Sequence, residues 1–247
     1  MLDLSQTTLS QAKTMARTLR DGLSGRSISL SHSACLELVA HQFGYPNWNV
    51  LAARLESPRP PAPPLALPKG WFVTGSVTAE SHRLGLDPAL PGAILIESRL
   101  ERGQGTLGDR IAVLMQSVEA EAFRGQRLRL SVDLRCRDAE CGTIWMRVDG
   151  RERMSLAFDN MMTRTSQGPV TGDRDWTRRS VVLDVTDEAA SLHYGVFLKG
   201  TGRVWARGVR LDVVGPDIPV TAEPRTLPRY DKGLLSPVPT NLDFREA

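Results

Sequence analysis

The spacing of hydrophobic residues changes once along this chain of 247 residues. In the first 56 residues, apolar side chains recur every three or four positions, which is the period of an amphipathic helix. From residue 70 onward they alternate with polar side chains, which is the period of a half-buried strand. The pattern therefore predicts a small helical part followed by a larger β part.

A proline-rich run separates the two patterns. Six of the twelve residues from Ser57 to Pro68 are proline, which fixes φ and lacks a backbone donor. We expect an extended spacer here, and a second extended segment after residue 216. The predicted parts are a three-helix domain over residues 1–56, a linker over 57–69, a β-sandwich domain over 70–216 and a proline-rich tail over 217–247.

Helix signals in the first part predict three helices. Gly25 suits the end of the first helix, Ser31 is the expected N-cap of the second, and Gly44 ends it. Pro46 lies where the third helix would begin. The apolar stripe of the first helix consists of Leu9, Ala12, Ala16, Leu19 and Leu23.

The turn between the second and third predicted helices has two interpretations. Ala40, Gly44 and Val50 are spaced as in two closely crossing helices, which is compatible with a helix-turn-helix. The third helix offers few cations for DNA phosphates, so a packing or docking module is the other interpretation. The residues that would contact DNA are Asn47, Asn49 and Arg54.

Three motifs in the helical part carry a family resemblance. They are Leu-Ser-His-Ser at residues 30–33, Leu-Glu-Leu-Val-Ala at residues 36–40 and Gly-Tyr-x-x-Trp at residues 44–48. With them, residues 11–55 resemble the small helical domain named after glyoxalase-related proteins. The sequence lacks the metal-binding βαβββ pattern of glyoxalase enzymes, so the resemblance implies no reaction. His32 and His41 are not at ligand spacing on one helix face, and we expect no metal and no cofactor.

Nine strands are predicted in the β part, with Gly, Asp and Asn between them. Nine strands with few helices predict one antiparallel domain of two sheets. Arginines at alternate positions, such as Arg127, Arg129 and Arg135, indicate a solvated sheet face. The candidate strands are residues 71–77, 93–98, 111–120, 128–136, 143–148, 155–159, 177–185, 192–199 and 204–213.

Residues 123–131 (FRGQRLRLS) and 200–205 (GTGRVW) carry a second resemblance. These passages are similar to jelly-roll carbohydrate-binding modules. A closer likeness, carried by residues 145–150 and 156–161, is to an uncharacterised jelly-roll module of bacterial proteins, some of them regulators. The resemblance implies a jelly-roll sandwich that binds a saccharide. Carbohydrate-binding relatives usually have acidic residues after the closing-strand Trp, often near a structural calcium, whereas this chain has Ala206, Arg207 and Gly208, so the calcium site that the resemblance implies is left open.

Polar and aromatic side chains of the predicted strands form a candidate ligand site. Aromatic rings stack on the apolar faces of sugars, while Asp, Asn and Arg bind hydroxyl groups. For Trp145 a core position and a ligand-facing position remain open, whereas Trp205 is expected in the core. The candidate ligand-binding residues, expected to line one concave sheet, are Trp145, Arg147, Asp149, Asp159 and Asn160.

Charge and composition narrow the cellular setting. The formal net charge of +3 is too small to imply a nucleic-acid partner. No apolar run approaches the ~20 residues of a membrane helix, and the polar N-terminus does not resemble a secretory signal, so we expect a cytoplasmic protein without a membrane partner. Cys136 and Cys141 flank a predicted hairpin turn and Cys35 stands alone; all three are expected to be reduced.

The sequence offers no motif for catalysis. Asp149, Asp159, Asp173 and Asp175 are candidates for paired carboxylates, but each lies at a predicted strand end, where Asp commonly shapes turns. No nucleophile elbow, phosphate-binding loop, zinc motif or dinucleotide fingerprint occurs, so no catalytic residue is assigned.

We therefore predict a non-catalytic binding protein. Its sandwich would bind a saccharide, another small molecule or a protein partner, and its helices would serve for docking. The alternatives are a DNA-binding transcriptional regulator with a β-sandwich sensor, and a sugar- or carbonyl-processing hydrolase or lyase. A homo-oligomer remains open.

Overall fold

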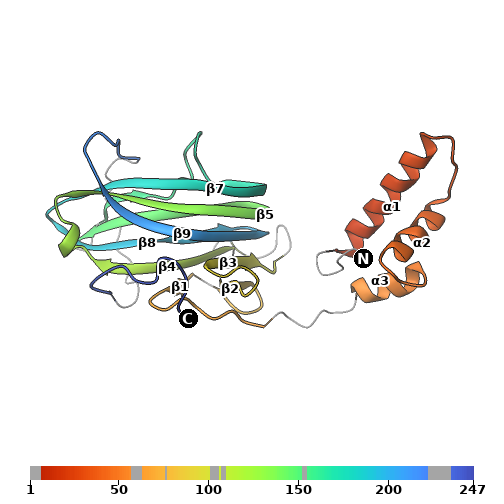
Figure 1. The fold of residues 1–247 in the computed structure, drawn as a ribbon, viewed down its shortest axis with the longest axis horizontal. Coiled ribbons are helices and arrows are strands. Elements are labelled where there is room, and N and C mark those ends of the chain that lie inside the picture. Colours follow the sequence, from red (N-terminus) through yellow and green to blue (C-terminus); the bar gives the residue numbers. More distant parts are fainter. Residues whose placement is uncertain are drawn as a thin grey trace. The chain divides into compact units, whose positions relative to one another are not determined.

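The computed structural model describes residues 7–56, 63–75, 77–100, 106, 110–151, 155–221 and 235–247. The chain divides into two compact units, Met1–Ala62 and Pro63–Ala247. Figure 1 shows three helices in the first unit and a large antiparallel sheet in the second, as the hydrophobic pattern predicts. The first half of the predicted linker, residues 57–62, lies outside the described residues.

The helical unit consists of α1 (Leu9–Ser24), α2 (His32–Gln42) and α3 (Trp48–Glu56). Its local signals act as predicted at two helix ends. Ser31 caps α2 by accepting a hydrogen bond from the Ala34 backbone, and Gly25 is the C-cap of α1. The helices pack through a core of mostly small side chains, which lets their backbones approach. The buried residues are Ala12, Ala16, Cys35, Val39, Ala40, Phe43 and Leu51.

The start of α3 differs from the prediction. Asn47, not Pro46, precedes the helix, and its Oδ1 accepts a hydrogen bond from the Val50 backbone at 3.0 Å. The carboxylate of Glu37 on α2 accepts a second bond from the Trp48 N–H at 2.8 Å. Proline therefore stands one residue before the cap. Val50, expected to pack in the crossing, is 43% exposed and outside the core.

Within the described residues, the β unit contains nine strands in one antiparallel sheet. In the strand path β1-β4-β8-β5-β9-β3-β2, both β6 and β7 add to β5. The strands are β1 (Phe72–Thr74), β2 (His82–Leu86), β3 (Ala93–Ser98), β4 (Ile111–Glu119), β5 (Gln126–Gly150), β6 (Ser155–Asp159), β7 (Val170–Val185), β8 (Ala189–Lys199) and β9 (Arg203–Val214).

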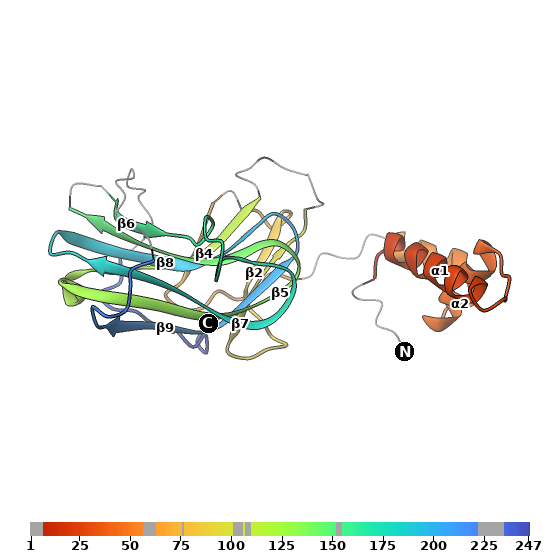
Figure 2. The same cartoon turned by 90° about the horizontal axis from the view of Figure 1, so that it is seen from above.

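The long strand β5 belongs to two layers. Its residues 127–137 pair with β9, and its residues 141–150 pair with β8. The sheet curls so that a first layer (β1, β4, β8, β6 and the end of β5) faces a second layer (β2, β3, β9, β7 and the start of β5), and Figure 2 shows β6 and β8 above β7 and β9. The predicted hairpin turn between Cys136 and Cys141 is therefore wrong. The bend is taken up within one strand by shifts of register and by the positive φ of Asp138.

One hydrophobic core lies between the two layers. Leu128 and Leu130 on β5, Leu114 on β4 and Ile94 on β3 are at most 1% exposed and belong to the same cluster. The C-terminal residues close this core at one edge, where Phe244 is 2% exposed and its ring centroid lies 5.0 Å from that of Trp71. Residues 222–234 of the predicted tail lie outside the described residues.

No helix in the described ranges has the length and apolar character required to cross a lipid bilayer.

Candidate functional site

Three neighbouring strands bring polar side chains together on the face of the first layer that points away from the main core. In the register of β4, β8 and β5, Ser117, His193 and Arg147 lie side by side, and Ser191 lies beside Asp149 in the next row. All five are buried, with exposed fractions of 3% or less. We call this set the polar cluster: Ser117, Arg147, Asp149, Ser191 and His193.

His193 connects the members of the polar cluster. Its Nδ1 lies 2.7 Å from Ser117 Oγ, and its Nε2 lies 2.9 Å from Ser191 Oγ. Nε2 is also 3.3 Å from Asp149 Oδ2, the same oxygen that accepts a hydrogen bond from the Arg147 guanidinium. Two serines, a histidine, an aspartate and an arginine thus form one connected network inside the protein.

The second oxygen of Asp149 has no hydrogen-bond partner among the described residues. Its side chain is 0% exposed, so this Oδ1 is a buried acceptor without a donor. Unsatisfied buried acceptors are rare because each costs about 1–3 kcal/mol. The position is therefore suited to a donor from outside the described residues.

Burial raises the pKa of the Asp149 carboxyl, but hydrogen bonds from His193 and Arg147 and the charge of Arg147 outweigh it and hold this pKa below the ordinary value. The carboxylate is thus charged at neutral pH. Its contribution to stability is present above the unfolded pKa of about 3.9 and is lost as the pH falls through the lower folded pKa.

An apolar cluster continues the same face beyond the polar one. Trp145 is 4% exposed and packs with Met115 and Phe197. Its ring centroid lies 6.4 Å from that of Phe158 on β6. Gly195 of β8 stands between Met115 and Trp145 in the register. The sequence left open whether Trp145 lies in the core or faces a ligand. In the structure Trp145 is buried, in this second cluster and not in the main core.

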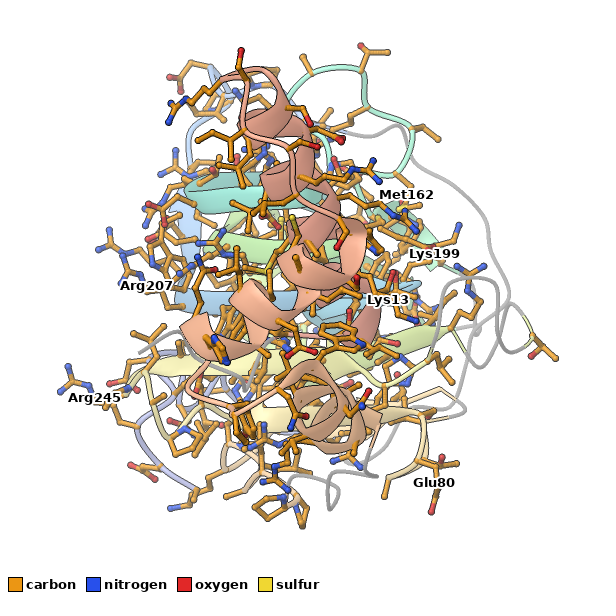
Figure 3. All side chains as sticks on the ribbon, turned by 90° about the vertical axis from the view of Figure 1, so that its right-hand side faces the viewer. Lys13, Glu80, Met162, Lys199, Arg207 and Arg245 are labelled. Atoms are coloured by element: carbon orange, nitrogen blue, oxygen red, sulfur yellow. The ribbon has the colours of Figure 1, made fainter. Side chains whose placement is uncertain are left out.

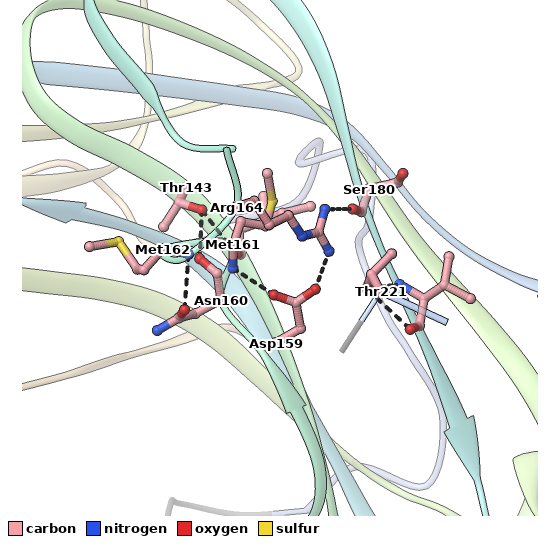
Figure 4. Close-up of polar contacts among 10 residues, drawn as sticks. Thr143, Asp159, Asn160, Met161, Met162, Arg164, Ser180 and Thr221 are labelled. Carbon is pink, nitrogen blue, oxygen red and sulfur yellow. Dashed lines mark hydrogen bonds and ion pairs between the residues drawn. The ribbon is translucent and has the colours of Figure 1, made fainter. Parts of the chain in front are cut away.

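The structure does not place all five predicted ligand residues on one face. Asp159 pairs with Met146, so it points toward the opposite side of the first layer from Arg147 and Asp149. Figure 4 shows Asp159 between Arg164 and the Met161 backbone, and Arg164 also bonds to the Ser180 carbonyl at 2.9 Å. Asn160 accepts a hydrogen bond from the Met162 backbone at 3.1 Å. The expected single concave surface is wrong for Asp159, because strand alternation turns it to the other side.

Three members of the polar cluster were absent from the sequence prediction: Ser117, Ser191 and His193. Their signal is the alternation within β8, where Ser191 and His193 face one way and the buried Leu192 and Tyr194 face the other. Alternation marks the shared face of a strand but does not say which strand lies beside it.

Trp205 is also placed differently from the prediction. It lies half-buried on the outward face of β9, where its Nε1 donates to Asp87 at 2.7 Å. The Arg135 guanidinium lies 5.5 Å from its ring centroid. Residues that are paired in register lie on the same face of a sheet. Trp205 is paired with Arg135, which faces outward, so Trp205 lies outside the core.

Of the carboxylates considered for catalysis, Asp149 and Asp159 do not form a pair. Asp149 and Asp159 face opposite sides of the first layer, and Asp173 accepts bonds from the Asp138 backbone and from Arg137. The described residues contain no group of three or more His, Cys, Asp or Glu side chains that could hold a metal ion. Cys35, Cys136 and Cys141 are free thiols, and burial raises the pKa of both Cys136 and Cys141.

In the helical unit, only part of the predicted DNA-contacting set faces solvent. Asn49 and Arg54 are exposed, whereas the Asn47 side chain is engaged in the cap of α3. Trp48 packs against the helical core.

Comparison with known proteins gives one family match and one curated relative. Residues 2–82 match the family model described as "Glyoxalase superfamily protein", which confirms the resemblance of the helical part. The uncharacterised HTH-type transcriptional regulator YbfP of Bacillus subtilis is 32% identical over 179 residues, which is 72% of this chain and 57% of the relative. The chain thus spans a little over half of that relative. Because the helical unit has 62 residues, most of the match falls in the β unit.

Similar solved structures include two carbohydrate-binding modules. One is a CBM4 structure with 14% identity, a TM-score of 0.41 and coverage of 60% of this chain and 89% of that chain. The other is the CBM22-1 xylan-binding domain from Paenibacillus barcinonensis Xyn10C, with 10% identity, a TM-score of 0.41 and coverage of 60% and 88%.

Proposed function

We propose that this protein is a non-catalytic binding protein that holds a small polar ligand at the polar cluster, in a β unit of the jelly-roll class. The observation that carries the proposal is the charged, fully buried Asp149, which has one oxygen without a donor. A buried ion pair rarely adds net stability compared with apolar side chains of the same size. Such a cluster is therefore better explained by recognition than by folding.

The chemistry of the cluster sets the ligand class. Asp149 Oδ1 accepts a hydrogen bond, so the ligand presents a hydroxyl or amine donor. Ser117 and Ser191 supply hydroxyl groups that donate or accept, and Trp145 and Phe158 provide an apolar wall beside them. A saccharide or a polyol combines donors with an apolar face. Because Trp145 and Asp149 are nearly inaccessible in this conformation, binding requires neighbouring side chains to shift.

Ligand binding is testable on the full chain. We expect a member of a panel of monosaccharides, oligosaccharides, polyols and amines to raise Tm in differential scanning fluorimetry, and calorimetric titration to give its Kd. Replacing Ser191 by Ala should weaken that Kd about fivefold, since one buried hydrogen-bonding group is worth about 1 kcal/mol. Ser131→Ala, a buried serine of the second layer, should leave the Kd unchanged. The proposal fails if no panel member binds, or if both variants bind like the parent.

A DNA-binding regulator, acting in the cytoplasm, is the second candidate. The observation that favours it is the relative from Bacillus subtilis, whose name describes an HTH-type transcriptional regulator and whose match includes most of the β unit. In this alternative the β unit senses a ligand, and Asn49 and Arg54 of α3 contact DNA.

The two candidates differ in the response to DNA. If the regulator is correct, the full chain should retard duplex DNA in a gel shift at 50 mM salt and lose much of its affinity at 200 mM, because phosphate contacts release counterions. Arg54→Gln should weaken the shift, whereas Arg245→Gln in the C-terminal segment should not. Salt-independent retardation, or none, excludes this candidate.

A further inference from the structure

The outward side of the second layer carries a surface unrelated to the polar cluster. On the first part of β5, on β7 and on β9, the outward residues are mostly arginine and aspartate. Figure 3 shows Arg207 on one side of the β unit, with Lys199 of β8 and Met162, which follows β6, on the other side. We call this surface the arginine face: Arg127, Arg129, Asp133, Arg135, Trp176, Arg178, Asp184, Trp205, Arg207, Arg210 and Asp212.

Three carboxylates on the arginine face are already paired. Arg178 binds Asp133 through two nitrogens at 2.8 and 3.0 Å. Arg127 binds Asp184 in the same way at 2.6 and 3.0 Å, and Arg129 lies 3.7 Å from Asp212. Each of these aspartates is already paired with one arginine, so no aspartate of this set is available to neutralise a further arginine.

Three further arginines on this face have no ion pair among the described residues. They are Arg135, Arg207 and Arg210, and Arg207 and Arg210 are exposed. A hydrogen bond from Arg178, with smaller effects from the charges of Arg178, Arg207 and Arg210, holds the pKa of Asp133 below its ordinary value. The face therefore carries a local excess of positive charge.

Tryptophan rings hold two of these guanidinium groups. The guanidinium carbon of Arg207 lies 4.1 Å from the centroid of the Trp176 ring, and that of Arg135 lies 5.5 Å from the Trp205 ring. Stacking of this kind restricts a long side chain at little cost in desolvation. Stacking on a ring face leaves the N–H groups at the edge of a guanidinium available to bind a carboxylate through two hydrogen bonds.

We propose that the arginine face docks an acidic, extended segment of a protein partner, whose carboxylates bind Arg135, Arg207 and Arg210. Arg210 and Arg207 lie opposite Ser131 and Asp133 of β5, and Arg135 is the next outward residue of β5. Alternate residues of a β-strand lie about 6.8 Å apart, so an extended peptide with a carboxylate at every second position matches this row of arginines. Charge complementarity indicates an acidic partner, because these three arginines have no ion pair among the described residues.

The signs of the neighbouring charges favour a protein over other anions. A polyphosphate is negative along its whole length and would meet Asp133, Asp184 and Asp212 as well as the arginines. A second copy of this chain would bring an equal excess of positive charge to the interface. A peptide with polar residues between its carboxylates avoids both repulsions.

A defined peptide tests the proposal on the full chain. The probe is a fluorescein-labelled 12-residue peptide in which Glu alternates with Thr, and the comparison probes are a peptide of the same composition with its Glu residues in one block, and a 12-nucleotide oligothymidylate. Fluorescence anisotropy at 50 mM salt gives each Kd. We expect the alternating peptide to bind most tightly. The double variant Arg207→Gln/Arg210→Gln should weaken it at least about tenfold, because two charge-assisted contacts are lost.

Arg245→Gln is the matched control, since Arg245 is highly exposed but lies in the C-terminal segment. The Kd of the alternating peptide for this variant should equal that for the parent. Unchanged melting temperatures would show that the variants remain folded. The proposal is overturned if the alternating peptide does not bind, if the block peptide or the oligonucleotide binds as tightly, or if the double variant binds like the parent. It is also overturned if sedimentation shows a dimer that the double variant abolishes.

Discussion

Replacing Asp149 by Ala is expected to destabilise the β unit by about 3–5 kcal/mol, because removal of one member of a buried ion pair leaves the other charge without compensation. Arg147 is 3% exposed and would keep its charge inside the protein. His193 would lose a contact at the same time. Urea unfolding of the full chain, followed by tryptophan fluorescence, measures the loss, since four of the five tryptophans lie in the β unit.

Two further variants separate the buried pair from ion pairing in general. Asp133→Ala removes the partner of Arg178 on the arginine face, where the Arg178 side chain is 49% exposed, and should cost about 1 kcal/mol or less. Arg147→Met combined with Asp149→Leu should be more stable than Asp149→Ala, because neither charge remains. A cost for Asp149→Ala close to that of Asp133→Ala would contradict the buried network.

Gly195→Ala should cost about 3 kcal/mol, although it adds a single methyl group. The new Cβ would overlap the carbonyl oxygen of Leu114 and lie 2.9 Å from Met115 Cα. Both groups belong to β4, so relief requires two paired strands to separate in the middle of the first layer. Overpacking of a rigid region costs about 1–3 kcal/mol, and backbone atoms cannot move aside as a flexible side chain can. The same urea titration measures the effect.

Gly22→Ala is the control for this substitution. Gly22 lies in α1, and an added Cβ would have nothing within 4 Å. Ala is favoured over Gly in a helix by about 0.5–1 kcal/mol, so this variant should stabilise the helical unit and leave the unfolding of the β unit unchanged. Equal effects of the two substitutions would mean that β4 and β8 are not as closely spaced as described.

The local parts of the fold were accessible from the sequence. Ser31 and Gly25 mark helix ends because capping depends on hydrogen bonds within a few residues. The bounds of β3 and β6 are those predicted, because each strand is marked by its own short run of residues. Where longer-range packing decides, the prediction is wrong. β2 was not predicted, and its Gly85 lies directly against the Ala66 carbonyl, a contact made only once residues 63–68 pass along it.

In the candidate site, too, features set by local sequence were predictable and features set by long-range packing were not. Alternation correctly places Trp145, Arg147 and Asp149 on one face of β5. It could not reveal that Ser117 and His193 lie beside Arg147, because Ser117 and His193 are 76 positions apart in the chain. Asp159 was assigned to the wrong face because its side depends on the register between β5 and β6, which includes a shift near Asp149.

The sequence by itself determined where this protein is helical, where it is extended and which residues of each strand share a side, since these features depend on period and on local hydrogen bonds. Only the tertiary structure decided which strands are neighbours. That choice assembled the polar cluster around His193 and left three arginines on the opposite layer without carboxylates. Strand order and register follow from how distant apolar surfaces fit together in one core, and no short segment of the chain contains that information.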